Sequence, residues 1–265
     1  MKRFFFVGAL FGVLSFAGIA QAQDEGELAK KAQNPVSPLM SVPFQNNFNF
    51  GVGPNNDLQY VLNVQPVIPF KLNDDWNLIT RTIVPLTYQP VLAPGVGEVF
   101  GLGDIQPQLY LSPRSSGSFT WGAGPVFQFP TATDTALGTG KWAAGLAAAA
   151  IFTKGPWVVG GLANNIWSYA GDSNRTDVSL LTVQPIINYN LSEGWYLTSS
   201  PIITANWMAD GGNQWTLPIG GGVGKIFRIG GQPLNAQLAA YDNVVTPHGG
   251  ADWQIRFQIQ FLFPK

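Results

Sequence analysis

Alternation of apolar and polar residues, in segments of about ten residues, is the feature of this sequence that most restricts its fold. The last segment is the clearest, because every second residue from Trp253 to Phe263 is apolar. The polar residues between them are Gln254, Arg256, Gln258 and Gln260. A period of two places successive side chains on opposite faces of a β-strand. The chain is therefore predicted to be an all-β protein.

Twelve such segments are expected between clusters of turn-forming residues. They cover residues 44–52, 57–71, 76–89, 104–113, 118–130, 141–153, 156–169, 177–191, 195–207, 214–227, 233–244 and 252–263. An even number of strands suits a closed antiparallel barrel, and after the first connection tight turns alternate with mostly longer loops. This pattern is typical of outer-membrane proteins with both termini in the periplasm. The predicted fold is a transmembrane antiparallel β-barrel of about twelve strands.

Two local features conflict with regular strands. Pro66, Pro107, Pro125, Pro185 and Pro201 fall in mid-strand, where each removes a ladder donor, so either they mark bulges or the expected strand edges are wrong. The alanine-rich stretch 142–152 is also compatible with a helix on propensity alone.

The composition limits the class of protein. Apolar residues make up 46% of the chain and charged residues only 11%, with 14 Lys and Arg against 15 Asp and Glu. Disordered chains combine low hydrophobicity with high net charge, so disorder is excluded. Without a surplus of positive charge, no nucleic-acid partner is expected. The absence of cysteine excludes disulfides and thiolate metal sites.

The N-terminus has the pattern of a secretory signal peptide over residues 1–22. Lys2 and Arg3 precede an apolar run, which ends at Ala20-Gln21-Ala22, a small-x-small cleavage pattern. We expect this signal to direct export and to be cleaved after Ala22. The expected location of the mature protein is the bacterial outer membrane. The alternative is a retained N-terminal membrane helix.

Residues 23–43 are expected to form a periplasmic N-terminal segment, and residues 44–265 the barrel. Residues 25–33 are predicted to form a short helix that ends at Asn34-Pro35. The segment is either a simple periplasmic tail or a plug in the lumen.

The nine tryptophans gather near the ends of the predicted strands. Two belts at the two membrane interfaces are therefore expected, one beside the tight turns and one beside the long loops. The first belt contains Trp76, Trp121, Trp157 and Trp195; the second contains Trp142, Trp167, Trp207, Trp215 and Trp253. The alternative is a soluble β-sandwich with core tryptophans, which predicts more Lys and Glu on the polar strand faces than the sequence has.

The polar face of the strands is expected to line the lumen. The predicted pore-lining residues are Asn47, Asn49, Gln59, Asn63, Gln65, Arg81, Gln106, Gln108, Gln184, Asn188, Asn206, Gln237, Arg256 and Gln258. Lys225 is a further candidate for an inward positive charge, and Asp104 is a candidate counter-charge. Carboxamides both donate and accept hydrogen bonds, so such a wall replaces the hydration of polar solutes without strong selection by charge.

These features predict a channel for passive or facilitated uptake of small neutral or weakly anionic solutes. Its expected partners are outer-membrane lipid, lipopolysaccharide, the small-molecule solute and, during biogenesis, the barrel-assembly machinery. The alternative is a closed structural barrel, in which pairs of Asn and Gln cross-link and fill the lumen.

Catalytic chemistry is sparse in this sequence. His248, the only histidine, lies in a predicted loop, where a histidine is more often solvated than catalytic. No catalytic residue, metal site or cofactor is therefore predicted, and the protein is not expected to be an enzyme. The less favoured alternative, a barrel lipid hydrolase, requires His248 close to a serine.

Several short motifs of the mature chain resemble those of the bacterial outer-membrane barrels named for the MetA pathway of phenol degradation, a family often mislabelled neuromedin U. The motifs are Leu28-Ala29-Lys30, Gln33-Asn34-Pro35, residues 41–47, 49–54, 65–69, 101–105, 130–133 and 163–168, and the C-terminal residues 261–265. The resemblance implies an outer-membrane β-barrel and uptake of hydrophobic or aromatic compounds, and it brings no catalytic residues. In this chain Pro264-Lys265 follow Phe263, which displaces the terminal aromatic signal of outer-membrane proteins.

Overall fold

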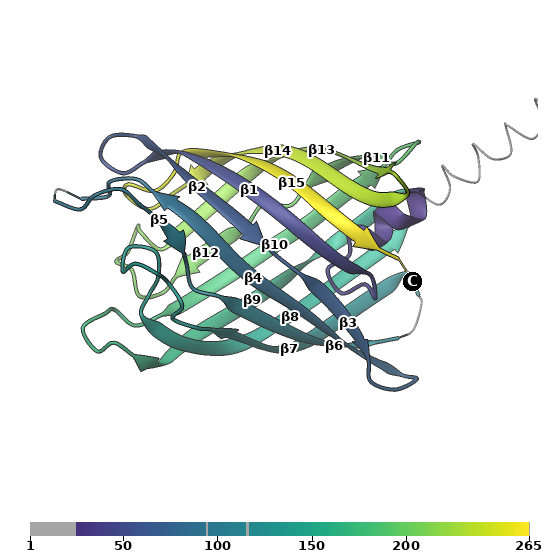
Figure 1. The fold of residues 1–265 in the computed structure, drawn as a ribbon, viewed down its shortest axis with the longest axis horizontal. Coiled ribbons are helices and arrows are strands. Elements are labelled where there is room, and N and C mark those ends of the chain that lie inside the picture. Colours follow the sequence, from purple (N-terminus) through teal and green to yellow (C-terminus); the bar gives the residue numbers. More distant parts are fainter. Residues whose placement is uncertain (1–24, 94, 115–116, 265) are drawn as a thin grey trace, which may run out of the picture.

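The computed structural model describes residues 25–93, 95–114 and 117–264, so the predicted signal peptide lies outside the described residues. The described chain is a closed antiparallel barrel (Figure 1). Its strand segments are β1 (Met40–Val52), β2 (Asp57–Val64), β3 (Val67–Lys71), β4 (Trp76–Gln89), β5 (Val99–Leu102), β6 (Gln106–Pro113), β7 (Phe119–Gln128), β8 (Lys141–Lys154), β9 (Trp157–Gly171), β10 (Ser179–Asn190), β11 (Trp195–Ser199), β12 (Ile203–Asn206), β13 (Trp215–Ile229), β14 (Gln232–Val245) and β15 (Trp253–Phe263).

The fifteen segments form twelve wall strands, which confirms the predicted fold class. β2 and β3, β5 and β6, and β11 and β12 are each the two parts of one interrupted strand. Each wall strand pairs with its neighbours in the chain, and β1 pairs with β15 from Met40↔Phe263 to Phe50↔Trp253. This last pairing closes the barrel and leaves no sheet edge, as a transmembrane sheet requires. The alanine-rich stretch is strand β8, not a helix.

The first strand begins at Met40, four residues before its expected start at residue 44. Met40 and Val42 continue the apolar alternation of Phe44 and lie opposite Phe263 and Phe261 of β15. The N-terminal segment therefore ends at residue 39 and not at residue 43.

Of the two alternatives for the mid-strand prolines, the bulge is not formed, because the ladder register does not shift at any of the five. Pro66 and Pro201 interrupt the wall strands, but the register continues unchanged across the first gap, from Phe44↔Val64 to Ser41↔Val67. The neighbouring amides keep the ladder in place, since Gln65 N donates to the carbonyl of Pro43. Pro107, Pro125 and Pro185 lie inside β6, β7 and β10. Each proline removes one donor without shifting a strand.

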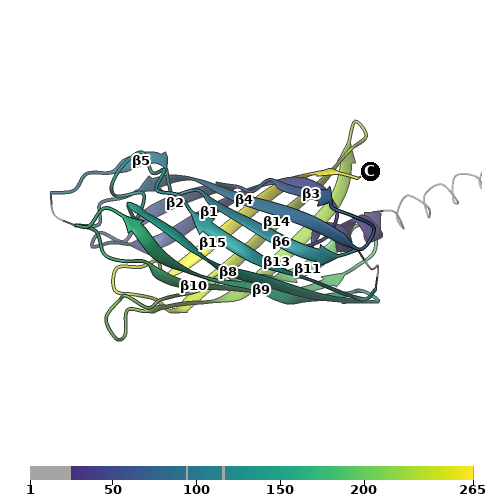
Figure 2. The ribbon, with the colours of Figure 1, turned by 90° about the horizontal axis from the view of Figure 1, so that it is seen from below.

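The two ends of the barrel differ. The helix over residues 25–32, the C-terminus and the short turns lie at one end, and the longer loops lie at the other (Figures 1 and 2). The turn between β13 and β14 is Gly230-Gly231, with φ of 55° and 86°, the left-handed conformation that a two-residue type I′ hairpin needs. Among the described residues, no helix is long and apolar enough to cross a membrane.

Candidate functional site

The barrel wall is apolar outside, and over β1 and β15 it is polar inside. On β1 and β15, Gln45 and Arg256 are 5% and 2% exposed, whereas the alternating neighbours Phe257 and Trp253 are 40% and 41% exposed. A soluble sandwich has the opposite arrangement, with its apolar faces buried. The lumen is therefore the place where polar chemistry is concentrated.

The ladder pairings place thirteen of the fourteen predicted pore-lining residues on the inward face. Gln65, between β2 and β3, joins them through its hydrogen bonds to Arg81 and Gln45. Asn63, for example, lies opposite Gln45, and Asn206 lies opposite Leu180 near the long loops. Side-chain hydrogen bonds join many of them, including Asn49 to Gln59 (2.7 Å) and Gln106 to Gln128 (2.9 Å). Gln184, Asn188, Gln237 and Gln258 line one cavity near the short-turn end.

Arg256 is held entirely by neutral groups. Its Nε donates to Asn47 Oδ1 (3.1 Å), one Nη donates to the carbonyl of Ser200 (2.8 Å) and the other to Gln254 Oε1 (3.1 Å). The guanidinium also lies 4.9 Å from the ring centre of Tyr241, which adds a cation–π contact. These contacts fix the positive charge against the lumen wall.

Arg81 has a similar environment on β4. It donates to Gln65 Oε1 (2.6 Å) and to Gln108 Oε1 (3.3 Å), and the Tyr110 hydroxyl also donates to Gln108. In the part of the chain that the structure describes, the ion pairs involve neither arginine. Neither buried cation is thus neutralised by a carboxylate.

A chain of carboxamides connects the two arginines. Gln65, which binds Arg81, donates to Gln45 Oε1, and Asn47, which binds Arg256, donates to the same oxygen, both at 3.4 Å. Polarised hydrogen bonds of this kind support one another in a low-dielectric interior. The network extends over β15, β1, β4 and β6, includes Gln65 between β2 and β3, and carries two positive charges.

Two predicted charge positions differ from expectation. Lys225 does not face the lumen, because its Nζ lies 4.7 Å over the ring of Trp195, opposite it in the ladder and 44% exposed. Among the described residues, Asp104 forms no ion pair with an arginine. Its carboxylate accepts from Thr139 N (2.7 Å) and Oγ1 (2.9 Å) and from Gln128 Nε2 (3.4 Å).

Three inward tyrosines were missed by the sequence reasoning. Tyr110, Tyr196 and Tyr241 are at most 2% exposed and share the inward face with the carboxamides. The ring of Tyr196 occupies the space over Gly224, where a Cβ would clash with the ring. The alternation of these tyrosines with outward-facing residues was the signal that could have identified them. Aromatic residues were instead expected on the lipid-facing side of the wall.

The N-terminal segment crosses the lumen at the short-turn end. On the helix, Leu28 and Ala29 contact Ile226 of β13 and Leu262 of β15. Further along, Val36 belongs to a second buried cluster, whose other members on β4 and β6 to β9 are Ile79, Tyr110, Val126, Ala143, Ala147, Ala149, Leu162 and Ile166. These two clusters belong to different sides of the wall, so residues 25–39 bridge the barrel.

A reciprocal amide pair fastens the segment to the wall. Gln33 Nε2 donates to Asn190 Oδ1 (2.9 Å), and Asn190 Nδ2 donates back to Gln33 Oε1 (3.2 Å). Asn34 turns the chain after the helix, since its Oδ1 accepts from Val36 N (3.0 Å).

The tryptophans lie near both ends of the wall strands, and most are about two-fifths to one-half exposed on the outer face. Trp76 contacts Trp121 and Trp157 contacts Tyr189 near the short turns. Trp207 contacts Trp215 and Trp253 stacks on Phe50 near the long loops.

His248 lies in a loop cleft beside Thr246, Pro247 and Asp252. Its backbone N donates to Asn213 Oδ1 (2.9 Å). The described residues that line this cleft include no serine. The serine–histidine arrangement of a hydrolase is therefore not formed there.

An ion pair closes the loop between β9 and β10 onto β8. The buried Lys141 Nζ lies 3.0 Å from Asp177 Oδ1. Hydrogen bonds from Lys141 and from Ser168 hold the pKa of Asp177 below its usual value. Because folding lowers this pKa, the ionised Asp177 stabilises the folded protein. This stabilisation is complete above the ordinary carboxyl pKa and is lost as the pH falls through the lowered pKa.

Asp177→Asn is expected to loosen this loop, because it leaves the Lys141 ammonium without an ionised partner. Limited proteolysis at pH 7 should cut the variant within residues 172–178 faster than the parent protein, and the parent should become equally sensitive only in strong acid. Asp210→Asn, in the loop before β13, is the control. Equal cleavage of all three proteins at pH 7 would contradict the assignment.

The fold and the outer face together define an antiparallel β-barrel of the transmembrane type. No family model and no curated protein sequence matches the chain. Among solved structures, an outer membrane channel from Pseudomonas putida F1 matches with a TM-score of 0.64 and 19% identity, over 85% of this chain and 94% of that one. The NanC porin matches with a TM-score of 0.54 and 8% identity, over 84% of this chain and 100% of that one. At these identities the likeness establishes the fold.

Proposed function

We propose that the protein is an outer-membrane channel for small neutral or weakly anionic solutes, and that the structure is its closed form. The observation that carries the proposal is the carboxamide network of the lumen, which joins Arg81 to Arg256. The outer-membrane channel and the porin with the same fold support a transport role.

The chemistry of the wall sets the solute class. Asn and Gln side chains offer donors and acceptors together, so they replace the hydration of hydroxyl, carbonyl and amide groups. The two arginines make the potential in the lumen positive, which disfavours cations and tolerates a single negative charge. An aromatic solute that suits this wall carries a hydroxyl or a carboxylate, as phenols and aromatic acids do.

Residues 25–39 act as the plug in this proposal. Burying Leu28 and Val36 contributes roughly 1.5–3 kcal/mol each, which favours the closed form. Only the Gln33–Asn190 pair and these apolar contacts need to break for the segment to leave, because β1 and the rest of the wall stay paired.

The membrane setting follows from the outer surface. We propose that the signal peptide 1–22 is cleaved on export, that the barrel-assembly machinery inserts the protein, and that the two tryptophan groups lie at the two interfaces of the bacterial outer membrane. The long-loop end then faces lipopolysaccharide.

Liposome swelling tests the solute class directly. Proteoliposomes of the detergent-purified protein without residues 25–39 should swell fastest in isotonic neutral solutes of small size, more slowly in monovalent organic anions and slowest in organic cations of matched size. Liposomes without protein are the control. Equal rates for all solutes would contradict the assigned selectivity, and no swelling at all would favour a closed structural barrel.

A further inference from the structure

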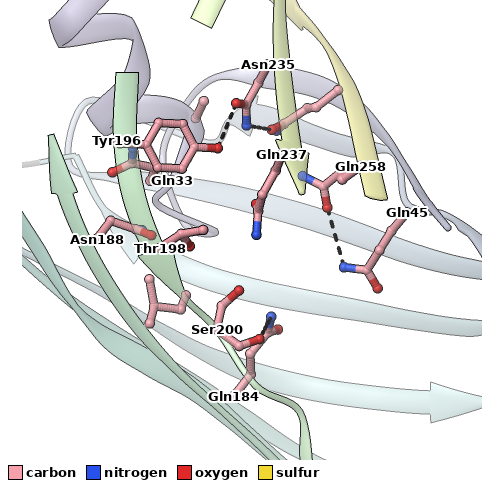
Figure 3. Close-up of a pocket in the computed structure, with 13 residues that line it drawn as sticks. Gln33, Gln45, Gln184, Asn188, Tyr196, Thr198, Ser200, Asn235, Gln237 and Gln258 are labelled. Carbon is pink, nitrogen blue, oxygen red and sulfur yellow. Dashed lines mark hydrogen bonds between the residues drawn. The ribbon is translucent and has the colours of Figure 1, made fainter. Parts of the chain in front are cut away.

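A cavity lies in the lumen beside the end of the N-terminal helix (Figure 3). Its volume is about 100 Å³, and Ala32 and Gln33 form part of its wall. This is room for several water molecules, or for one small solute that replaces them. The remaining walls come from β10 and β11 on one side and from β1, β14 and β15 on the other.

The walls of the cavity are neutral and held in place by one another. Tyr196 Oη donates to Asn235 Oδ1 (2.8 Å), and Asn235 Nδ2 donates to Gln260 Oε1 (3.0 Å). Gln45 Nε2 donates to Oε1 of its ladder partner Gln258 (3.4 Å). No described residue that lines the cavity is charged.

One wall group has no partner. Asn188 is 3% exposed, and its Oδ1 is buried without a hydrogen bond from any described residue. Thr198, also buried, lies directly opposite Asn188 in the ladder, so a hydroxyl group stands beside the free oxygen. A buried acceptor without a donor is costly, so the site is completed by a molecule that donates a hydrogen bond.

We infer that this cavity binds a small neutral polyol. Carboxylates and phosphates find no cation in the described lining, and an ammonium group finds no carboxylate there, so burying any of these ions leaves its charge unpaired. A hydroxyl group donates to Asn188 and accepts from the surrounding amides at the same time. The inference rests on the proposed solute channel and gives it a binding site within the lumen.

Saturation-transfer NMR on the detergent-purified full chain tests the site with glycerol, erythritol and xylitol as probes. We expect transfer to these polyols and none to glycerate, an anion of similar size. Asn188→Leu removes the acceptor and should weaken binding by about five- to tenfold, the loss of one hydrogen bond. Thr198→Val, nearly isosteric, is the second variant in case the first does not fold. Asn165→Leu removes a carboxamide from the outer face and should leave binding unchanged.

The outcomes separate the site from the channel. Absence of transfer to any polyol would mean that the cavity holds water only. Equal signals from the polyols and glycerate would mean that the cavity does not select neutral solutes. Either result overturns the proposed site, even if the barrel conducts. Polyol binding that Asn188→Leu weakens, in a barrel that never conducts or swells liposomes, would keep the site and overturn the channel.

Discussion

Deletion of residues 25–39 is expected to raise the conductance of the barrel in a planar lipid bilayer on the order of tenfold or more. The segment bridges the lumen between the cluster of Ile226 and Leu262 on one side and the cluster of Tyr110 and Ile79 on the other. A twelve-stranded barrel is wider than the eight-stranded barrels that side chains alone can fill. Because β1 begins at Met40, the deletion removes no strand.

A point variant should give a graded version of this effect. Gln33→Ala breaks both hydrogen bonds to Asn190 and should raise the open population by about thirtyfold, since each bond contributes about 1 kcal/mol. Lys31→Ala, exposed on the same helix, is the matched control. Identical conductance of the full chain and the deletion variant, both heat-modifiable on gels, would show that the segment is not a plug.

Replacement of the two lumen arginines by glutamine is expected to abolish the anion preference of the open barrel. A unit charge about 10 Å from a guanidinium, at an effective dielectric constant of about 20, interacts with it by roughly 1.7 kcal/mol before salt screening. The permeability ratio of chloride to potassium should therefore fall several-fold in the double variant Arg81→Gln, Arg256→Gln. Reversal potentials across a salt gradient measure this ratio, with residues 25–39 deleted in every protein.

The lysine variants separate charge from architecture. Arg81→Lys and Arg256→Lys keep the charge but lose the forked contacts to Gln65 and Gln254, so they should keep most of the preference while lowering thermal stability. Loss of selectivity in the lysine variants as well would attribute it to the shape of the wall. An unchanged ratio in the glutamine variants would exclude the arginines as its source.

Strand order and face orientation were predictable because the outer face repeats every second residue over a whole membrane thickness. The interrupted strands were also placed correctly, since the prolines do not shift the register. Lys225 was misplaced because Gly220 to Gly222 and Gly224 carry no side chains and hide the alternation of β13.

The contacts that make the site were not predictable in the same way. Gln33 and Asn190 are separated by 157 residues, and no local pattern links them. The inward tyrosines share their alternation with the carboxamides, but their fit depends on partners in other strands, such as Gly224 beneath Tyr196. Periodicity shows on which face of the wall a side chain lies. Which side chain it contacts depends on how the barrel closes.

The pairing of the first wall strand with the last has a consequence for biogenesis. Met40 meets Phe263 only after the whole chain is available, so the wall cannot be sealed while the chain is still being delivered. Contacts this distant in sequence form late, because the entropy of closing so long a loop must be overcome first. Residues 25–39 directly precede that seam strand. They are therefore enclosed when β1 pairs with β15 and do not have to be threaded into a finished barrel. The newly assembled protein then starts in the form in which this segment lies in the lumen.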